Sequence, residues 1–129
     1  MDRGQRGMPY VRLYADSEGE SHFEDATVEF TLGDYSPPTP PVWMSPFAPA
    51  GQYGFLSAPA GWVGEWHPVP RRQMCFCLVG EMELEVSDGE ARRFPAGAVA
   101  LVEDTVGRGH RTRIVGREDF VMAVALLPD

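Results

Sequence analysis

Glycine and proline punctuate this chain so often that it has little room for long helices. The 129 residues include 14 glycines and 12 prolines, and both residue types favour turns and interrupt regular hydrogen bonding. Apolar residues make up 43% of the chain and charged residues 23%. That balance is typical of a folded globular protein and excludes the disordered and fibrous classes. We therefore expect a single domain over residues 1–129, built mainly from β-strands.

The clearest strand lies in residues 81–86, where three glutamates alternate with Met, Leu and Val. Period-two alternation is typical of a strand with one buried face. Asp88-Gly89 follows directly and predicts a two-residue hairpin turn, with an antiparallel return strand over 91–94. Similar signals predict strands over 10–14, 26–32, 53–57, 62–67, 73–79, 98–103, 110–115 and 120–127. About ten short strands joined by Gly and Pro turns predict an antiparallel sandwich or barrel.

Two segments fall outside this pattern. Residues 1–9 combine Arg, Gly and Pro, which predicts a loose N-terminus. Residues 35–51 carry six of the prolines, so this segment cannot be helical. We expect it to form an extended arm over the surface, with Trp43, Met44 and Phe47 as anchors on the body or across a pocket mouth.

Charge and cysteine usage limit the partners and the compartment. The net charge is −8, which repels nucleic acid and anionic lipid, so we expect neither as a partner. The sequence contains no apolar run long enough for a signal peptide or a membrane span, which predicts a cytoplasmic protein. Cys75 and Cys77 are too close on one predicted strand to pair with each other, and we expect reduced thiols.

Strict alternation sorts two neighbouring strands into faces. It places Val63, Glu65, His67 and Val69 on one face of the first strand, and Gln73, Cys75, Cys77 and Val79 on one face of the second. Facing each other, they would form a mostly apolar cavity with a few polar groups, which is typical of a small-molecule site. We expect Val69, Cys75, Cys77 and Trp66 to line this pocket.

The spacing of Gly61, His67, Gln73 and Gly80 resembles the first motif of the cupin superfamily. In that motif a glycine precedes a His-x-His pair by five residues, and a glutamate and a second glycine follow. Val69 and Gln73 stand where the second histidine and the glutamate are expected. Pro95-Ala96-Gly97, followed after a strand by His110, is similar to the second motif. The resemblance covers 61–113 at the motif level, and we assign residues 61–115 to the motif-bearing core. It implies an all-β fold, an antiparallel double-stranded β-helix (jelly-roll) barrel.

The resemblance also implies a metal site, held in the family by three histidines and a glutamate. The matching residues here are His67, Gln73 and His110, a set that is neutral and binds a divalent ion such as Zn, Fe, Ni or Mn more weakly. Glu65 could restore the missing negative charge. The same three residues could instead form a hydrogen-bonding triad without metal, so a divalent metal ion remains one of two alternatives.

Each polar candidate has a structural alternative as well. His67 could bond to a main-chain carbonyl and His110 could merely end a turn. Gln73 could satisfy buried polar partners, and Glu65 could be a solvated carboxylate at the rim. The two cysteines are more typical of small apolar fillers than of metal ligands.

Our first functional interpretation is a small-molecule-binding cupin, with metal-assisted isomerase, cyclase or lyase chemistry in which Glu65 and His67 act as catalytic residues. A non-catalytic, metal-free ligand-binding or sensing module is the second. A metal-dependent, dioxygenase-like enzyme is the third. By the resemblance we also expect a homodimer, with residues 10–14 or the proline-rich arm as the exchange element.

Overall fold

A computed structural model describes residues 6–129. Those residues form eleven strands and no helix. The strands are β1 (Arg6–Ala15), β2 (Ser21–Gly33), β3 (Val42–Met44), β4 (Gln52–Ala58), β5 (Val63–His67), β6 (Gln73–Val79), β7 (Glu81–Val86), β8 (Ala91–Pro95), β9 (Val99–Val102), β10 (His110–Val115) and β11 (Phe120–Leu126). The predicted all-β class is therefore confirmed, and every predicted strand corresponds to an observed one.

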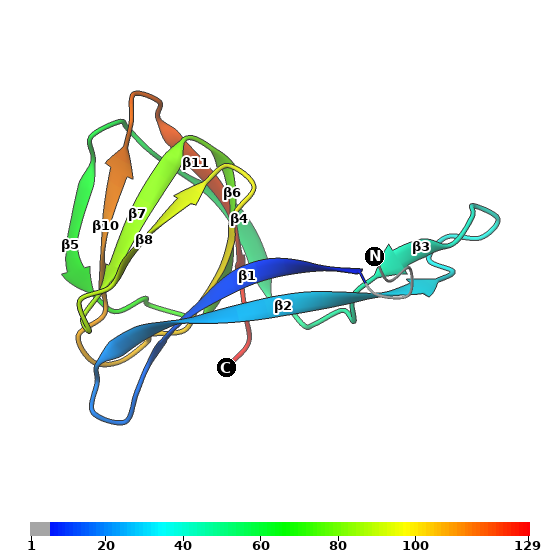
Figure 1. The fold of residues 1–129 in the computed structure, drawn as a ribbon, viewed down its shortest axis with the longest axis horizontal. Helices are drawn as coiled ribbons and strands as arrows, with labels where there is room; N and C mark the ends of the chain where they lie inside the picture. Colours follow the sequence, from blue (N-terminus) through cyan, green and yellow to red (C-terminus); the bar gives the residue numbers. More distant parts are fainter. Residues whose placement is uncertain (1–5) are drawn as a thin grey trace.

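The strands form two sheets that face each other (Figure 1). The larger has the order β3-β2-β1-β9-β6-β11-β4, and the smaller has the order β5-β10-β7-β8. Neighbouring strands are antiparallel except β1 and β9, which are parallel. We call β4 to β11, with the parts of β1 and β2 that pack on them, the body.

The hydrophobic core lies between the two sheets of the body. Leu13, Val86, Phe94, Cys75 and Ala100 are 2% exposed or less. Phe94, from the edge strand of the smaller sheet, meets Phe23 of β2 with 6.1 Å between ring centroids. This contact joins the two sheets where β8 faces β2.

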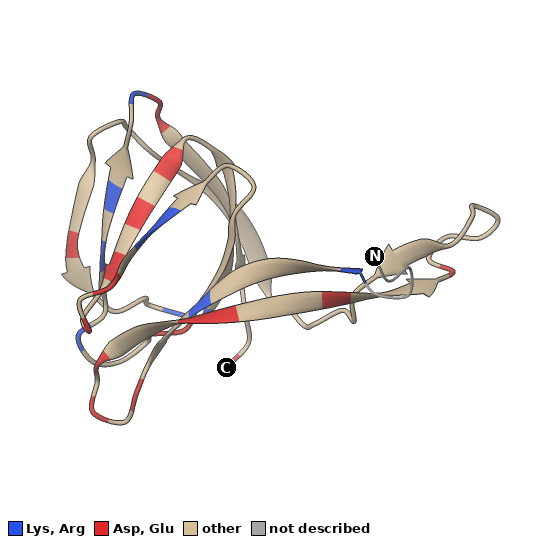
Figure 2. Ribbon diagram, viewed as in Figure 1, with Lys and Arg blue, Asp and Glu red and all other residues tan. Residues whose placement is uncertain are grey.

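The alternation in residues 81–86 predicts the burial of β7 correctly. Met82, Leu84 and Val86 are buried, whereas the three glutamates point to the outer face. There they meet arginines of the neighbouring strands, which form a charged ladder across β8, β7 and β10 (Figure 2). Arg113 donates to Glu83 at 2.9 Å and lowers the pKa of that carboxyl.

The turn after β7 differs from the predicted two-residue hairpin. Its loop contains Ser87, Asp88 and Gly89, closed by a bond from the Val86 N–H to the Glu90 carbonyl. Only Gly89 has a positive φ, of 102°, whereas the predicted turn needs two such residues. Asp88 instead accepts the Glu90 N–H through its side chain at 2.9 Å, which stabilises the three-residue form.

The predicted loose N-terminus is wrong for Arg6–Pro9, which belong to β1 and pair with β2. Residues 1–5 of that prediction lie outside the described residues. Pro9 is tolerated because β9 pairs with β1 only from Val11 onward, so the strand has a single neighbour at Pro9.

The proline-rich segment does not cross the body as predicted. It contains β3, which pairs with residues Thr31–Gly33 of β2. Residues 6–9 and 27–51 form an arm that projects away from the body (Figure 1). Trp43 packs under the Arg6 guanidinium at 4.7 Å, and Phe47 packs against Tyr35 with 5.8 Å between ring centroids. Two of the three expected anchors therefore pack within the arm itself, Trp43 on β1 and Phe47 on Tyr35.

Within residues 6–129 the structure has no helix that is long and apolar enough to cross a membrane.

Candidate functional site

A cavity of about 450 Å³ lies between the two sheets of the body. Its volume is within the range of small-molecule pockets, roughly 300–1,000 Å³. Most of the lining is apolar and comes from both sheets, including Leu56, Pro59, Met82, Leu84, Ile114 and Phe120. Polar side chains in the lining are few: His67, Gln73, His110, Thr112 and Ser57. The cavity thus combines an apolar container with a small polar cluster.

The structure brings His67, Gln73 and His110 together at this cavity. Of the four residues expected to line the pocket, Val69 and Cys75 do so. Cys77 is buried in the core at 3% exposure but is not part of the lining. Trp66 lies outside the cavity, 5.7 Å from the Arg111 guanidinium.

A β-bulge in β5 explains why alternation fails there. His67 pairs with His110, but Gly64 pairs with Thr112, so three steps along β5 match two along β10. The additional residue reverses the faces, and Gly64 and His67 share the inner face. Glu65 and Trp66 lie in the bulge and are exposed. The prediction that the Glu65 side chain shares a face with His67 is therefore wrong.

His110 is held by a buried carboxylate that sequence reasoning missed. Asp104 is 0% exposed, and its Oδ2 lies 2.7 Å from His110 Nδ1. The second oxygen, Oδ1, is buried and has no hydrogen-bond partner among the described residues. Because Nδ1 is occupied by Asp104, Nε2 is the nitrogen that His110 can offer to the cavity.

His67 is oriented in a different way. Its Nδ1 donates to the main-chain carbonyl of Glu65 at 2.6 Å. A bond to a main-chain carbonyl is the alternative predicted for this residue, but the ring also lines the cavity. The rings of His67 and His110 are 4.9 Å apart between centroids. Since a carbonyl only accepts, the proton of neutral His67 sits on Nδ1, and Nε2 carries the lone pair.

The remaining polar neighbours are weakly reactive. The Gln73 side chain donates to Cys75 Sγ at 3.4 Å. Burial raises the pKa of the Cys75 thiol to about 11 and that of Cys77 to about 12. Both cysteines are free, and at neutral pH both remain protonated, which makes them poor nucleophiles and poor metal ligands.

Gly109 is the residue that brings the two imidazoles together. Its φ is +75°, and a Cβ at this position would overlap the main chain of His67 and Pro68. The loop before β10 can therefore pack directly on the end of β5. Ser21, fully buried, donates to the Gly109 carbonyl at 2.6 Å, and the Val69 N–H donates to the Asp104 carbonyl at 3.1 Å.

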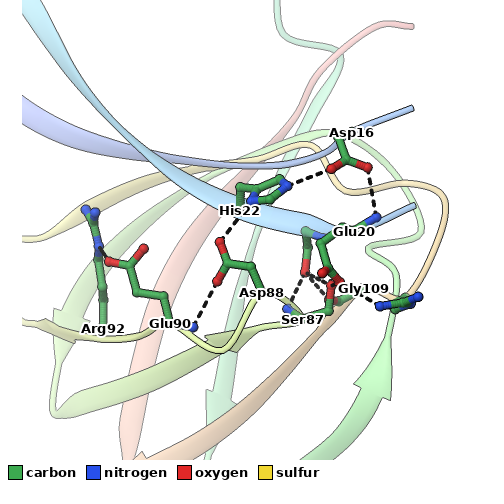
Figure 3. A network of polar contacts seen from close by, with 10 residues as sticks. Asp16, Glu20, His22, Ser87, Asp88, Glu90, Arg92 and Gly109 are labelled. Atoms are coloured by element: carbon green, nitrogen blue, oxygen red, sulfur yellow. Dashed lines mark hydrogen bonds and ion pairs between the residues drawn. The ribbon is translucent and has the colours of Figure 1, made fainter. Parts of the chain in front are cut away.

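A surface network ties this loop to the turn between β1 and β2 (Figure 3). His22 lies between two carboxylates, with Nε2 2.7 Å from Asp16 and Nδ1 2.8 Å from Asp88. The bond to Asp16, followed by that to Asp88, raises the pKa of His22, and His22 in turn lowers the pKa of Asp16. Ser87 joins the same network through Ser21 and Glu20. The sequence gives no signal for this network, because it joins the β1–β2 turn and the start of β2 to the turn after β7, which is more than sixty residues away along the chain.

The contribution of His22 to stability is expected to depend on pH. A raised pKa means that the folded chain binds the His22 proton more tightly than the unfolded chain does. The stabilisation is therefore complete below the unfolded-state value of about 6.5 and is lost as the pH rises through the folded-state pKa. It is also lost in acid, as the pH falls through the lowered pKa of Asp16.

We expect urea midpoints to show this. The midpoint of the wild type should exceed that of His22→Gln at about pH 6, and the difference should shrink at about pH 9. A difference that stays constant between these pH values would contradict the assignment, and comparison with the variant cancels the titration of the other two histidines.

The donor set does not fit a resident divalent metal ion of the kind that the family resemblance implies. Two imidazoles face the cavity, but the third matching residue is an amide, and none of the described carboxylates lines the cavity. Asp104 contacts Nδ1 of His110 and so supports a ring instead of facing the cavity. Among residues 6–129, no three His, Cys, Asp or Glu side chains are grouped to hold a metal ion. Without an anionic donor, such a set binds a dication weakly.

Comparison with known proteins supports the fold. The chain matches no protein-family model and no curated protein. A Cupin 2 conserved barrel domain protein from Salinispora arenicola superposes with a TM-score of 0.50 at 19% identity, over 78% of this chain and 76% of that one. The cupin domain of Cnp3 from Schizosaccharomyces pombe gives a TM-score of 0.49 at 15% identity, over 99% and 90%.

A conserved Streptococcus pyogenes protein of unknown function gives a TM-score of 0.42 at 23% identity over 60% of this chain, which spans 64% of that protein. The superposition on the Salinispora protein agrees with the two facing sheets of the body. The chain therefore has the fold of a cupin barrel domain.

Proposed function

We propose that this chain binds a small, largely apolar organic molecule in the body cavity and holds one polar group of the ligand at Nε2 of His67 and His110, without a resident metal ion. The observation that carries the proposal is the pair of imidazoles, 4.9 Å apart, in an otherwise mostly apolar lining. Each ring uses Nδ1 within the protein. Both Nε2 atoms are therefore available to a ligand hydroxyl or, when protonated, to a carboxylate.

We also infer that the two sheets form the double-stranded β-helix of cupins. The inference is supported by their interleaved connectivity, since the chain passes between the sheets from β4 to β5, from β5 to β6 and again from β10 to β11. This arrangement would place the two histidines on the inner surface of the smaller sheet, opposite Gln73 and Cys75 of the larger one.

Three aromatic probes of similar size test the binding site: phenylacetate, 2-phenylethanol and ethylbenzene. We expect phenylacetate or phenylethanol to stabilise the protein more than ethylbenzene. A probe at ten times its Kd adds about 1.4 kcal/mol, or roughly 5 °C in Tm for a chain of this size. Thermal unfolding should show the same shift with and without EDTA.

The matched variant is His67→Leu, which keeps the size of the lining but removes the imidazole. It should lose the preference for the polar probes while still binding ethylbenzene. Equal shifts in the wild type and His67→Leu would contradict the proposed role of the imidazoles. Loss of binding in EDTA would instead favour the metal-dependent alternative.

We further propose that a second copy of this chain covers the outer face of β4, β6 and β11. Tyr53 and Phe55 are 84% and 67% exposed there, and Phe76 and Leu78 are 39% and 48% exposed. None of the three strands contains a charged residue. Exposed apolar faces of this extent are typical of interaction sites.

The arm supports a second copy as the occupant of this face. It continues the same sheet beyond the body. On the face that carries Trp43 it presents Val28 and Phe30, which are half-buried, and Leu32, which is 53% exposed. A two-fold axis would place each arm against the apolar face of the other copy and cover both surfaces with one symmetric contact.

Light scattering after size exclusion is expected to give a dimer mass at micromolar concentration. Phe55→Arg should shift the protein to the monomer, because it buries a charge in the contact. Val106→Arg is the control, since Val106 is 64% exposed in a loop away from this face. A monomeric wild type, or equal masses for Phe55→Arg and the wild type, would contradict the proposal.

A further inference from the structure

We propose that the Asp104–His110 pair makes the cavity a proton-transfer site, in which Nε2 of His110 is the general base and Asp104 is its positioning residue. The inference rests on the proposed small-molecule function and goes beyond it to a reaction. Its substrate class is a small, mostly apolar molecule with a weakly acidic C–H bond beside an electron-accepting group. No metal ion takes part in the step.

The burial of Asp104 is the first observation. The residue is 0% exposed, and its Oδ2 lies 2.7 Å from His110 Nδ1. Its other oxygen has no partner among the described residues. Burying a carboxylate with an unpaired oxygen costs stability. A neutral side chain or a main-chain carbonyl could orient the ring without this cost, so orientation alone does not explain a carboxylate here.

His67, in the same cavity, is oriented without a buried carboxylate. Its Nδ1 bonds to the carbonyl of Glu65, which fixes the ring but supplies no negative charge. The two neighbouring imidazoles thus differ in the group that binds Nδ1, which is a carboxylate for His110 and a carbonyl for His67. Asp104 would stabilise the imidazolium that forms when His110 takes a proton, whereas His67 is suited to accept a hydrogen bond from the ligand.

The proposed step balances without an oxidant or reductant. The proton moves from the ligand carbon to Nε2 of His110, and the electron pair of the broken C–H bond stays on the ligand. It moves into an adjacent carbonyl or expels a leaving group on the neighbouring atom. Return of the proton from His110 to another atom completes an isomerisation, and transfer to the leaving group completes an elimination. His110 is only 7% exposed, and the apolar side chains beside it limit the water that would compete for the proton.

The base-promoted ring opening of 5-nitrobenzisoxazole provides a direct test. Removal of the C–H proton of its isoxazole ring breaks the N–O bond and gives a coloured cyanophenolate, so the reaction needs a positioned base and little else. We expect wild-type turnover to exceed that of His110→Gln by about 10²-fold to 10⁴-fold. Glu118→Gln, a substitution in an exposed turn, is the control and should match the wild type.

Asp104→Asn separates a positioning role from a merely structural one. We expect it to lower kcat by at least about tenfold with little change in KM, because the amide cannot stabilise the imidazolium. His67→Gln should act mainly on KM. If Asp104→Asn does not fold, His110→Gln alone still decides whether His110 is the base.

Thermal unfolding with the same probe distinguishes this inference from the proposed function. Stabilisation by the probe with equal turnover in the wild type and His110→Gln would overturn proton transfer and leave the binding site intact. Neither stabilisation nor turnover in the wild type would overturn both. Turnover lost on treatment with EDTA would also overturn the inference, because a bound metal would then be required.

Discussion

Gly109→Ala is expected to lower the free energy of unfolding by about 3 kcal/mol or more. Part of the loss comes from forcing an L residue into the left-handed region, at φ +75°, which costs about 1–2 kcal/mol. The rest comes from steric overlap of the new methyl group with the main chain of His67 and Pro68, since overpacking typically costs a further 1–3 kcal/mol. The neighbour is main chain, so it cannot turn aside as a flexible side chain would.

Gly116→Ala is the matched control for this prediction. Gly116 has a φ of +81° in the turn between β10 and β11, and a Cβ there would meet nothing within 4 Å. It should therefore lose only the conformational part, about 1–2 kcal/mol. Urea unfolding of the two variants, followed by tryptophan fluorescence, compares them directly. Equal losses would show that the loop does not need the close approach of Gly109 to β5.

Gly109→Ala is also expected to weaken ligand binding in the cavity. Gly109 directly precedes His110, and its contact with the end of β5 sets the separation of the two imidazole rings. A shift of the loop would move His110 away from His67 and disturb Asp104, whose carbonyl accepts the Val69 N–H. Gly109→Ala should therefore lose the preference for polar probes at temperatures where it is still folded, whereas Gly116→Ala should keep it.

Much of the fold follows from short-range patterns in the sequence. The strict alternation in residues 81–86 predicts both β7 and its buried face, because one side of that strand packs on the core and the other meets solvent. The spacing from Gly61 to Gly80 and the position of His110 place three polar residues on one cavity. Both signals depend on regular strands, in which the spacing of two residues along the chain determines whether their side chains lie on the same face.

Other features of the site depend on contacts between parts of the chain that are distant in sequence. Alternation puts Glu65 beside His67, but the bulge in β5 reverses the faces between them, and a bulge of this kind depends on the pairing strand. Asp104 lies in a loop, and the role of its side chain depends on the contact with His110. His22 is important only because the turns that carry Asp16 and Asp88 meet in space. These features are long-range, and one sequence does not reveal them.

The position of the arm also depends on long-range strand pairing, which the sequence does not reveal. Its prolines exclude a helix, as predicted, but they do not show that three further residues pair with the end of β2. That pairing turns Trp43 toward Arg6, away from the body. The length of β2 decides the outcome, because its 13 residues extend well beyond the part that packs on the core.

Phe94→Ala is expected to be comparably destabilising, by about 3–5 kcal/mol. Phe94 is 2% exposed and lies on the edge strand β8, where it pairs with Met82 of β7 and contacts the ring of Phe23 on β2. Truncation leaves a void between the sheets and removes an aromatic pair that adds about 0.5–1.5 kcal/mol beyond its buried area. Phe47→Ala is the control: Phe47 is 75% exposed on the arm, so its loss should stay within about 0.5 kcal/mol.

The effect should reach the cavity, because Met82 lies opposite Phe94 in the sheet and forms part of the cavity lining. Without Phe94, Met82 can move into the void, and phenylacetate should bind more weakly to Phe94→Ala than to Phe47→Ala at a temperature where both are folded. A double-mutant cycle with Phe23→Ala measures the contact between the sheets, and a coupling of about 0.5–1.5 kcal/mol is expected for neighbouring aromatic rings. Additive losses in that cycle would contradict a stabilising contact between the two rings. Coupling with unchanged phenylacetate binding would show that the contact joins the two sheets but does not shape the cavity.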